Sequence, residues 1–277
     1  MIPNSETNFL WLASSLLEAK YSEFLAGFQS ALHANSIAHD FLPHTKDIWA
    51  VDFMPVQLSE DRFVQFVYNP DYLRNYPKWK KTISDVDQIC NAIGMRPKLS
   101  PIVLDGGNAA KHRFKAVLCD KVFEENPSIS KTRLISLLME ELELDELYFI
   151  PWDRNDLTGH ADGMVRFIDE RTVLVNAYAR EPKLLDAVTK PLKEAGLDCI
   201  PVPYHPYNNS RFDDATGIYI NYLQMSEAVF IPTFGIREDE AALAEFERIF
   251  KKVVPVRSEQ IATGGGILSC ISWNIKK

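Results

Sequence analysis

Residues 164–202, MVRFIDERTVLVNAYAREPKLLDAVTKPLKEAGLDCIPV, contain the structural unit on which the prediction of the fold rests. Two short apolar runs, at residues 164–168 and 172–175, flank a polar turn and predict a pair of strands. Residues 181–195 then predict a helix, and the apolar run at residues 199–202 predicts a third strand. One α/β unit therefore has the order strand, strand, helix, strand.

The same order of elements recurs along the chain, about once every fifty residues. No Ser/Gly/Pro-rich linker interrupts it, so we expect one α/β domain over residues 1–277. Periodicity alone also permits a doubly wound sheet. Outside the unit above, the predicted strands are residues 8–13, 48–56, 62–68, 102–104, 146–150, 218–224, 228–231, 253–256 and 267–273, and the predicted helices are residues 22–34, 84–92, 130–140 and 239–252.

The composition restricts the class of protein. Hydrophobic residues make up 46% and charged residues 25% of the 277 residues, which is typical of a globular chain. The net charge is -8 and no dense Lys/Arg cluster is present, so we expect no nucleic-acid partner. This charge fits a cationic substrate, although solubility alone is the simpler explanation.

The termini and the cysteines indicate a location. The first residues lack the basic region of a signal peptide, and no apolar run reaches the ~20 residues that cross a bilayer. Four cysteines without a CxxC pair predict a reducing compartment rather than a disulfide framework. We therefore expect a cytoplasmic protein without membrane contact, either a monomer or a homo-oligomer.

Two acidic segments follow apolar runs. Asp52 lies inside the apolar run of residues 48–56, where a buried carboxylate needs a cationic or hydrogen-bonding partner. An Asp bonded to backbone at a strand end explains this position equally well. Residues 104–108, LDGGN, read as an ordinary turn, whose glycines also permit a close approach to another group.

A third segment, residues 158–167 (TGHADGMVRF), combines a histidine with a carboxylate. In an extended chain His160 and Asp162 project to the same side, and a neighbouring carboxylate would orient the imidazole and raise its pKa. The pair suits general acid/base catalysis better than metal binding, because no third ligand has a recognisable spacing. A capped turn before a strand is the structural alternative.

The fourth segment, residues 263–273 (TGGGILSCISW), contains Cys270 four residues after three glycines. A lone cysteine in an apolar strand is more often an inert core residue than a nucleophile. The glycines are not a phosphate-binding P-loop, because the GK[ST] ending is missing. Cys90, Cys119 and Cys199 have neither a glycine run nor a histidine beside them, so we interpret them as structural.

Together these four segments resemble the agmatine deiminase and bacterial-type peptidylarginine deiminase family of guanidino-group-modifying enzymes. They occur in the family order and cover nearly the whole chain. The stretch at residues 219–235, which includes Asn221, Pro232 and Thr233, also resembles the family's penultimate unit. The matching residues are Trp49, Asp52 and Pro55 in the first segment, Asp105, Gly106 and Gly107 in the second, Gly159, His160, Asp162, Arg166 and Phe167 in the third, and Gly264, Gly265, Gly266, Ile267 and Cys270 in the fourth.

The resemblance implies a five-bladed α/β propeller, also called the pentein fold, with pseudo-fivefold repeated units and the active site on its central axis. It implies that Cys270 is the nucleophile and His160 the acid/base. Asp52 and Asp162 would hold a guanidinium. The reaction would pass through a covalent thiouronium, release ammonia and a ureido product, and need no metal or organic cofactor. The further substrate-binding residues that it implies are Trp49, Asp105, Gly107, Asn108 and Gly266.

Three positions depart from the family pattern. Val51 replaces an arginine, Ser269 replaces the histidine usual before the nucleophile, and Asp105 replaces a glutamate. The usual N-terminal extension, rich in Trp and Pro, is short or missing. These departures would affect the far end of the substrate, so the partner is predicted as a small guanidino compound. Agmatine leads, and peptidylarginine deimination, amidino transfer, a dihydrolase reaction and a non-catalytic binding role stay open.

Overall fold

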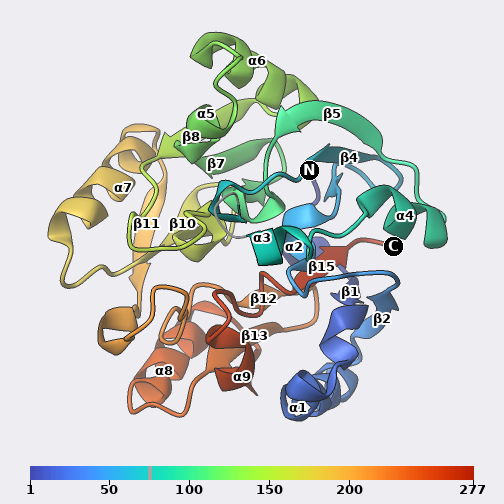
Figure 1. Ribbon diagram of the computed structural model, residues 1–277. Helices are drawn as coiled ribbons and strands as arrows, with labels where there is room; N and C mark the ends of the chain where they lie inside the picture. The colour runs from blue at the N-terminus through green and yellow to red at the C-terminus, as the bar shows by residue number, and fades with distance from the viewer. Residues whose placement is uncertain (74–76) are drawn as a thin grey trace.

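The computed structural model describes residues 1–73 and 77–277, and its strands form five three-stranded sheets. The sheets surround a central axis as the blades of a propeller (Figure 1). In every blade the middle strand pairs antiparallel with an inner strand and parallel with an outer strand. The fold is therefore the predicted five-bladed α/β propeller, and the strands do not join into one doubly wound sheet.

Each blade uses its three strands in the same way. The inner strands border the axis, and the middle strands lie between neighbours on both sides. The inner strands are β15 (Ser272–Ile275), β3 (Val56–Gln57), β6 (Ala109–His112), β9 (Val165–Phe167) and β12 (Leu223–Gln224). The middle strands are β1 (Phe9–Ala13), β4 (Phe63–Val67), β7 (Lys115–Cys119), β10 (Thr172–Asn176) and β13 (Val229–Thr233), and the outer strands are β2 (Ala38–Leu42), β5 (Lys98–Val103), β8 (Glu146–Ile150), β11 (Asp198–Val202) and β14 (Val253–Arg257).

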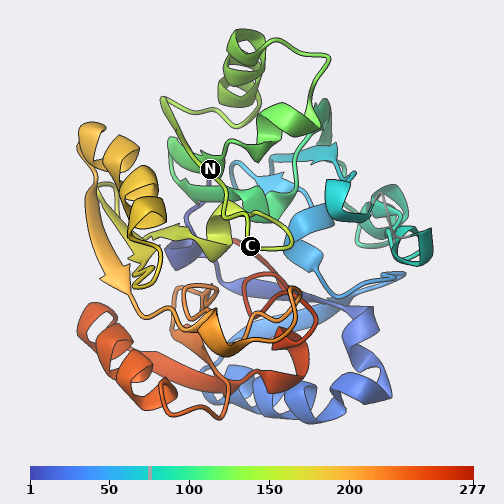
Figure 2. The same cartoon turned by 60° about the vertical axis from the view of Figure 1, so that its left-hand side comes forward.

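Helices connect the middle strand of each blade to its parallel outer strand. They lie on the outside of the ring, as Figures 1 and 2 show from two directions. This placement is expected, because a parallel pair needs a crossover that covers the sheet. The crossover helices are α1 (Ser22–Ala34), α4 (Val86–Ala92), α6 (Lys131–Glu141), α7 (Pro182–Glu194) and α8 (Asp239–Ile249), and the shorter helices are α2 (Ala50–Phe53), α3 (Pro77–Lys80), α5 (Lys121–Glu125) and α9 (Glu259–Ala262).

The unit at residues 164–202 forms β9, β10, α7 and β11 in the predicted order. Val173, Leu174 and Val175 of β10 are almost completely buried because neighbours cover both faces of a middle strand. Helix α7 begins with a proline, whose fixed φ angle suits the first helical position, and buries Leu192 on its inner side. Local sequence and tertiary packing therefore favour the same structure here.

Three predicted strands differ from the structure. Residues 48–56 contain α2 followed by the short strand β3, and residues 267–273 contain a turn that ends where β15 begins. Residues 218–224 contribute only the two residues of β12. These runs are apolar because they are buried near the axis, and a short apolar run does not distinguish a strand from a buried turn. The prediction also omitted β2, β6 and β7, of which β2 and β6 have the more polar sequences.

Both ends of the chain meet in one blade. Strand β15 pairs antiparallel with β1, so that Leu12 lies opposite Ser272 and Phe9 lies opposite Ile275. This pairing closes the ring. Within residues 1–73 and 77–277, no helix has the length and apolar character needed to span a membrane.

Candidate active site

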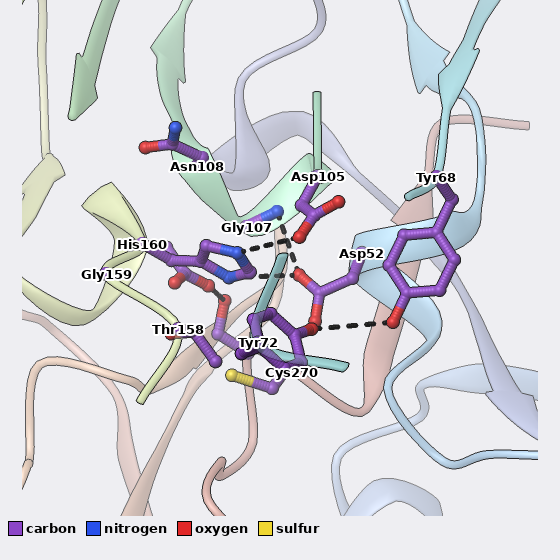
Figure 3. Close-up of polar contacts among 12 residues, drawn as sticks. Asp52, Tyr68, Tyr72, Asp105, Gly107, Asn108, Thr158, Gly159, His160 and Cys270 are labelled. Atoms are coloured by element: carbon purple, nitrogen blue, oxygen red, sulfur yellow. Dashed lines mark hydrogen bonds and ion pairs between the residues drawn. The ribbon is translucent and has the colours of Figure 1, made fainter. Parts of the chain in front are cut away.

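Every blade contributes the segment that leads into its inner strand, and we call these five segments the lead-in segments. They converge at one end of the axis, where Figure 3 shows side chains from several of them together. Residues far apart in the sequence thus meet because they occupy equivalent positions in five repeats. The lead-in segments carry Asp52 in α2, residues 105–108, residues 160–162, Asn221 and Cys270.

His160 lies between two carboxylates. Its Nδ1 is 3.3 Å from Asp52 Oδ1, and its Nε2 is 3.1 Å from Asp105 Oδ2. All three side chains are buried. Burial lowers the pKa of His160, but the two carboxylates outweigh it and raise the pKa well above its usual range. The imidazole is therefore held as a doubly paired imidazolium.

These partners correct one detail of the sequence prediction. The segment is not extended, since Ala161–Gly163 form a single 3-10 turn after His160. The carboxylates that orient the imidazole are consequently Asp52 and Asp105, and Asp162 points elsewhere. Asp105 thus has its side chain engaged with His160, whereas the sequence had placed it among the substrate contacts.

Asp162 accepts a hydrogen bond from Ser269 Oγ at 2.8 Å. Burial raises the pKa of the Asp162 carboxyl to about 6, although His160, Arg166 and the Ser269 hydroxyl oppose this increase. Asp162 is therefore a buried carboxylate that lacks a directly bonded cation, and its charge would be stabilised by a cationic ligand.

Cys270 lies in the turn that precedes β15. Asn221 Nδ2 is 3.2 Å from Cys270 Sγ, and Asn221 Oδ1 accepts a hydrogen bond from the Ser269 N–H at 3.1 Å. Asn221 thereby bridges the thiol and the backbone beside it. Burial raises the pKa of the Cys270 thiol well above its usual range, and Asp162 and Asp52 raise it further. Without a ligand, Cys270 is a neutral thiol beside two carboxylates.

Two glycines allow the lead-in segments to approach each other closely. A Cβ on Gly107 would lie 2.6 Å from Asp52 Oδ1 and 2.8 Å from His160 Nδ1. The Gly107 N–H instead donates to Asp52 Oδ1 at 3.1 Å. A Cβ on Gly266 would lie 2.6 Å from the Trp49 ring and 3.0 Å from Cys270 Sγ. Larger side chains at either position would separate the groups of the site.

Lys121 contacts several segments on one side of His160. The Lys121 ammonium is 2.7 Å from Asp71 Oδ1, donates to the Thr158 carbonyl and lies 5.3 Å from the centre of the Tyr72 ring. The Tyr72 ring in turn packs edge-on against His160, with centroids 6.3 Å apart. Lys121 therefore links the segment beside Tyr72 to the lead-in segment of His160.

Asn108 is the predicted site residue that the structure does not bring to the cluster. Its Oδ1 accepts from the Cys119 N–H at 2.9 Å, and its Nδ2 contacts the Cys119 carbonyl. Figure 3 shows the side chain directed away from Asp52 and Cys270. Both ends of the amide thus bond to β7, so Asn108 fixes the lead-in segment to its own blade. In the described part of the chain, no group of three or more His, Cys, Asp or Glu is arranged to hold a metal ion.

The sequence profile of the Porphyromonas-type peptidyl-arginine deiminases matches residues 5–275. The chain belongs to this family. A relative from Photobacterium profundum assigned as an agmatine deiminase is 22% identical, over 84% of this chain and 76% of the relative. One from Streptococcus mutans with the same assignment is 24% identical, over 82% and 73% of the two chains.

Solved structures share the fold of this deiminase-family chain. The agmatine deiminase of C. jejuni superposes with a TM-score of 0.76 at 19% identity, over 100% of this chain and 95% of the other. DDAH from Pseudomonas aeruginosa superposes with a TM-score of 0.60 at 11% identity, over 97% and 99% of the two chains. The pentein fold predicted from the resemblance is therefore confirmed.

Two positions that depart from the family pattern lie elsewhere than expected. Ser269 bonds to Asp162, and the Val51 N–H donates to the Cys270 carbonyl at 3.2 Å. Both residues line a cavity on the axis behind the carboxylates. We had expected them at the far end of the substrate. Asn221, which sequence reasoning named only within a matching stretch, contacts Cys270, and its position before β12 could have indicated this.

Proposed function

We propose that this protein is a deiminase that hydrolyses the guanidinium group of a small guanidine, with agmatine as the leading substrate. One observation carries the proposal: the lead-in segments bring Cys270, His160 and the carboxylates Asp52 and Asp162 to the same end of the axis. The relatives assigned as agmatine deiminases support agmatine over other guanidines.

The two carboxylates suit a planar cation. Asp52 and Asp162 are each 5% exposed, so their charges are shielded from water, and Asp162 forms no ion pair within the described part of the chain. A guanidinium donates paired N–H groups in one plane, and carboxylates accept such pairs in a bidentate manner. Binding between them would offset the cost of burying the carboxylates and fix the plane of the substrate.

The substrate itself would help to ionise the nucleophile. The negative charges of Asp162 and Asp52 disfavour a Cys270 thiolate in the free protein. A bound guanidinium neutralises these charges and places a cation beside the sulfur, which lowers the pKa of the thiol. The thiol proton passes to water, and the thiolate forms where it can attack the guanidinium carbon.

The reaction balances with His160 as the only proton shuttle. Cys270 Sγ forms a bond to the guanidinium carbon, and one C–N bond breaks while His160 donates a proton to the departing nitrogen. Ammonia leaves and a thiouronium remains. His160 then takes a proton from water, the hydroxide attacks the same carbon, and the C–S bond breaks while the hydroxyl proton passes to the leaving sulfur, which gives the ureido product and restores the Cys270 thiol. Asp105 holds Nε2, which leaves Nδ1 on the side of Asp52 for both transfers.

The enclosure of the site favours a small substrate over peptidyl arginine. Asp52, His160 and Asp162 are all 5% exposed or less. We expect ammonia and ureido product from agmatine, and less from free arginine, methylated arginines and an arginyl peptide. If a folded, monodisperse preparation turns over none of these compounds, the proposal is wrong.

A labelling experiment separates the enzyme from a non-catalytic binding protein with the same fold. A haloacetamidine mimics the guanidinium and alkylates fastest a thiol that lies beside a site able to bind its amidinium group. We expect one equivalent of label on Cys270, with protection by agmatine. Label distributed over Cys199 and Cys90, with an inert Cys270, would favour the binding role.

A further inference from the structure

The cavity lined by Val51 and Ser269 lies on the axis, behind the carboxylates of the proposed active site. It has a volume of about 50 Å³, and the inner strands of all five blades contribute to its wall. Asp162, Ser269, Asn4 and Ser5 are among the residues that line it, whereas Cys270 and His160 are not. On this measure a water needs about 10–15 Å³, so the cavity holds a few waters or one small ion.

Two cations border this cavity, Lys111 on β6 and Arg166 on β9. Arg166 is 5% exposed, donates from Nη1 to the Tyr222 carbonyl at 3.0 Å and packs over the Tyr222 ring. Among residues 1–73 and 77–277, neither cation has a carboxylate within 4.0 Å. Arg166 is buried and Lys111 half-buried, and the carboxylate in the same wall, Asp162, forms no ion pair with either, so the wall carries an excess of positive charge.

Neutral hydrogen-bond donors without a partner also line this cavity. The Ser272 hydroxyl is buried without a hydrogen-bond partner among the described residues, and Ser272 lines the cavity. Gln224, 8% exposed, lines the same wall, and its side-chain amide bonds to none of the described residues. The carboxylate in the wall, Asp162, already accepts from Ser269. Spare donors and positive charge therefore exceed the acceptors around this space.

We propose that this axial cavity is a binding site for one small monovalent inorganic anion, of the size of chloride, held between Lys111 and Arg166. The positive charge of the wall disfavours a metal cation, and the volume excludes larger organic anions. Water alone would satisfy the neutral donors but would leave Asp162 as the single carboxylate facing two cations in the described wall. The site is separate from Cys270 and does not depend on the proposed deiminase reaction.

The charge state of Lys111 makes the binding dependent on pH. Burial, with a smaller contribution from Arg166, lowers the pKa of Lys111 to about 8. An anion binds the ammonium and not the neutral amine. Its affinity should therefore fall as the pH rises through about 8, and it should increase again as Asp162, in the same wall, becomes protonated below about pH 6.

Chloride binding can be measured by chloride NMR line width and by thermal unfolding in chloride against gluconate at equal ionic strength. We expect saturable binding and a higher Tm in chloride. Lys111→Met should weaken the binding at least tenfold, while the matched variant Lys183→Met, at an exposed position on α7, should leave it unchanged. Equal chloride dependence in both variants, or none in the parent protein, would overturn the proposal.

A diffraction experiment tests whether an anion occupies the axial cavity even if Lys111→Met does not fold. Crystals of the unaltered protein grown in bromide should show an anomalous peak between Lys111 and Arg166, and this peak should weaken at pH 9. A cavity filled by water alone, or bromide found only on the surface, contradicts the proposed site.

Discussion

The two ends of the central axis are made by the same five inner strands but carry opposite charge. At the lead-in end, Asp52, Asp105 and Asp162 surround His160 and Cys270. A few residues further along β6 and β9, Lys111 and Arg166 face the axial cavity. The comparison shows that the fold supplies a ring of positions without a fixed chemistry. The side chain at each position decides whether that end suits a cation or an anion.

Removing the nucleophile should have the largest effect on the acidic end. Cys270→Ala should lower kcat by about 10⁴-fold or more, because no other group can form the covalent intermediate. Ammonia release under saturating agmatine measures this loss. Cys199→Ala is the matched control, since Cys199 lies on the outer strand β11 and should keep full activity. Comparable losses in both variants would mean that Cys270 has no special role.

Neutralising the Asp162 carboxylate should have the second-largest effect on activity. Asp162→Asn should lower kcat/KM for agmatine by about 10²–10³-fold, corresponding to about 2–5 kcal/mol for a broken buried charge pair. The free energy of unfolding should rise at neutral pH, because the folded pKa of about 6 lies above the usual value of 3.8 and the ionised carboxylate destabilises the fold. Lost activity together with lost stability would instead indicate a purely structural residue.

Much of this arrangement could be predicted from the sequence, but the success was uneven. Helix α1 has the predicted bounds because its apolar residues recur with helical spacing over a long segment. The lead-in segments were mistaken for strands because their apolar character comes from burial near the axis. The partners of His160 could not be found, because they depend on which blades adjoin in space. Asn108 shows that a residue within a family motif can face away from the site.

Crowding between two lead-in segments should have a smaller effect. Gly107→Ala places a methyl group against Asp52 and His160, and a displacement of about 1 Å can reduce activity by about 10²-fold. Gly27→Ala is the matched control, because its Cβ would meet nothing within 4 Å and alanine favours the helix. Steady-state kinetics and thermal unfolding of both variants separate the local effect from a general one. Unchanged kcat/KM in Gly107→Ala would show that the site tolerates the displacement.

The smallest effect should be a shift in pH dependence. Guanidinium binding needs an ionised Asp162, so kcat/KM should fall as the pH drops through about 6. Ser269→Ala removes a hydrogen bond that favours the carboxylate, so the acid limb should move to higher pH by up to about one unit. Ser269→Thr keeps the hydroxyl and should restore the original profile. An acid limb at the same pH in all three proteins would assign it to another group.

The pairing of β15 with β1 has a consequence for synthesis on the ribosome. The turn that holds Cys270 precedes β15, whose partner β1 is synthesised before every other strand of the ring. A nascent chain can form the other four blades first. The Cys270 thiol reaches its position in the site only when β15 emerges, pairs with β1 and closes the ring. Catalytic competence should therefore appear only after β15 has been synthesised and has paired with β1.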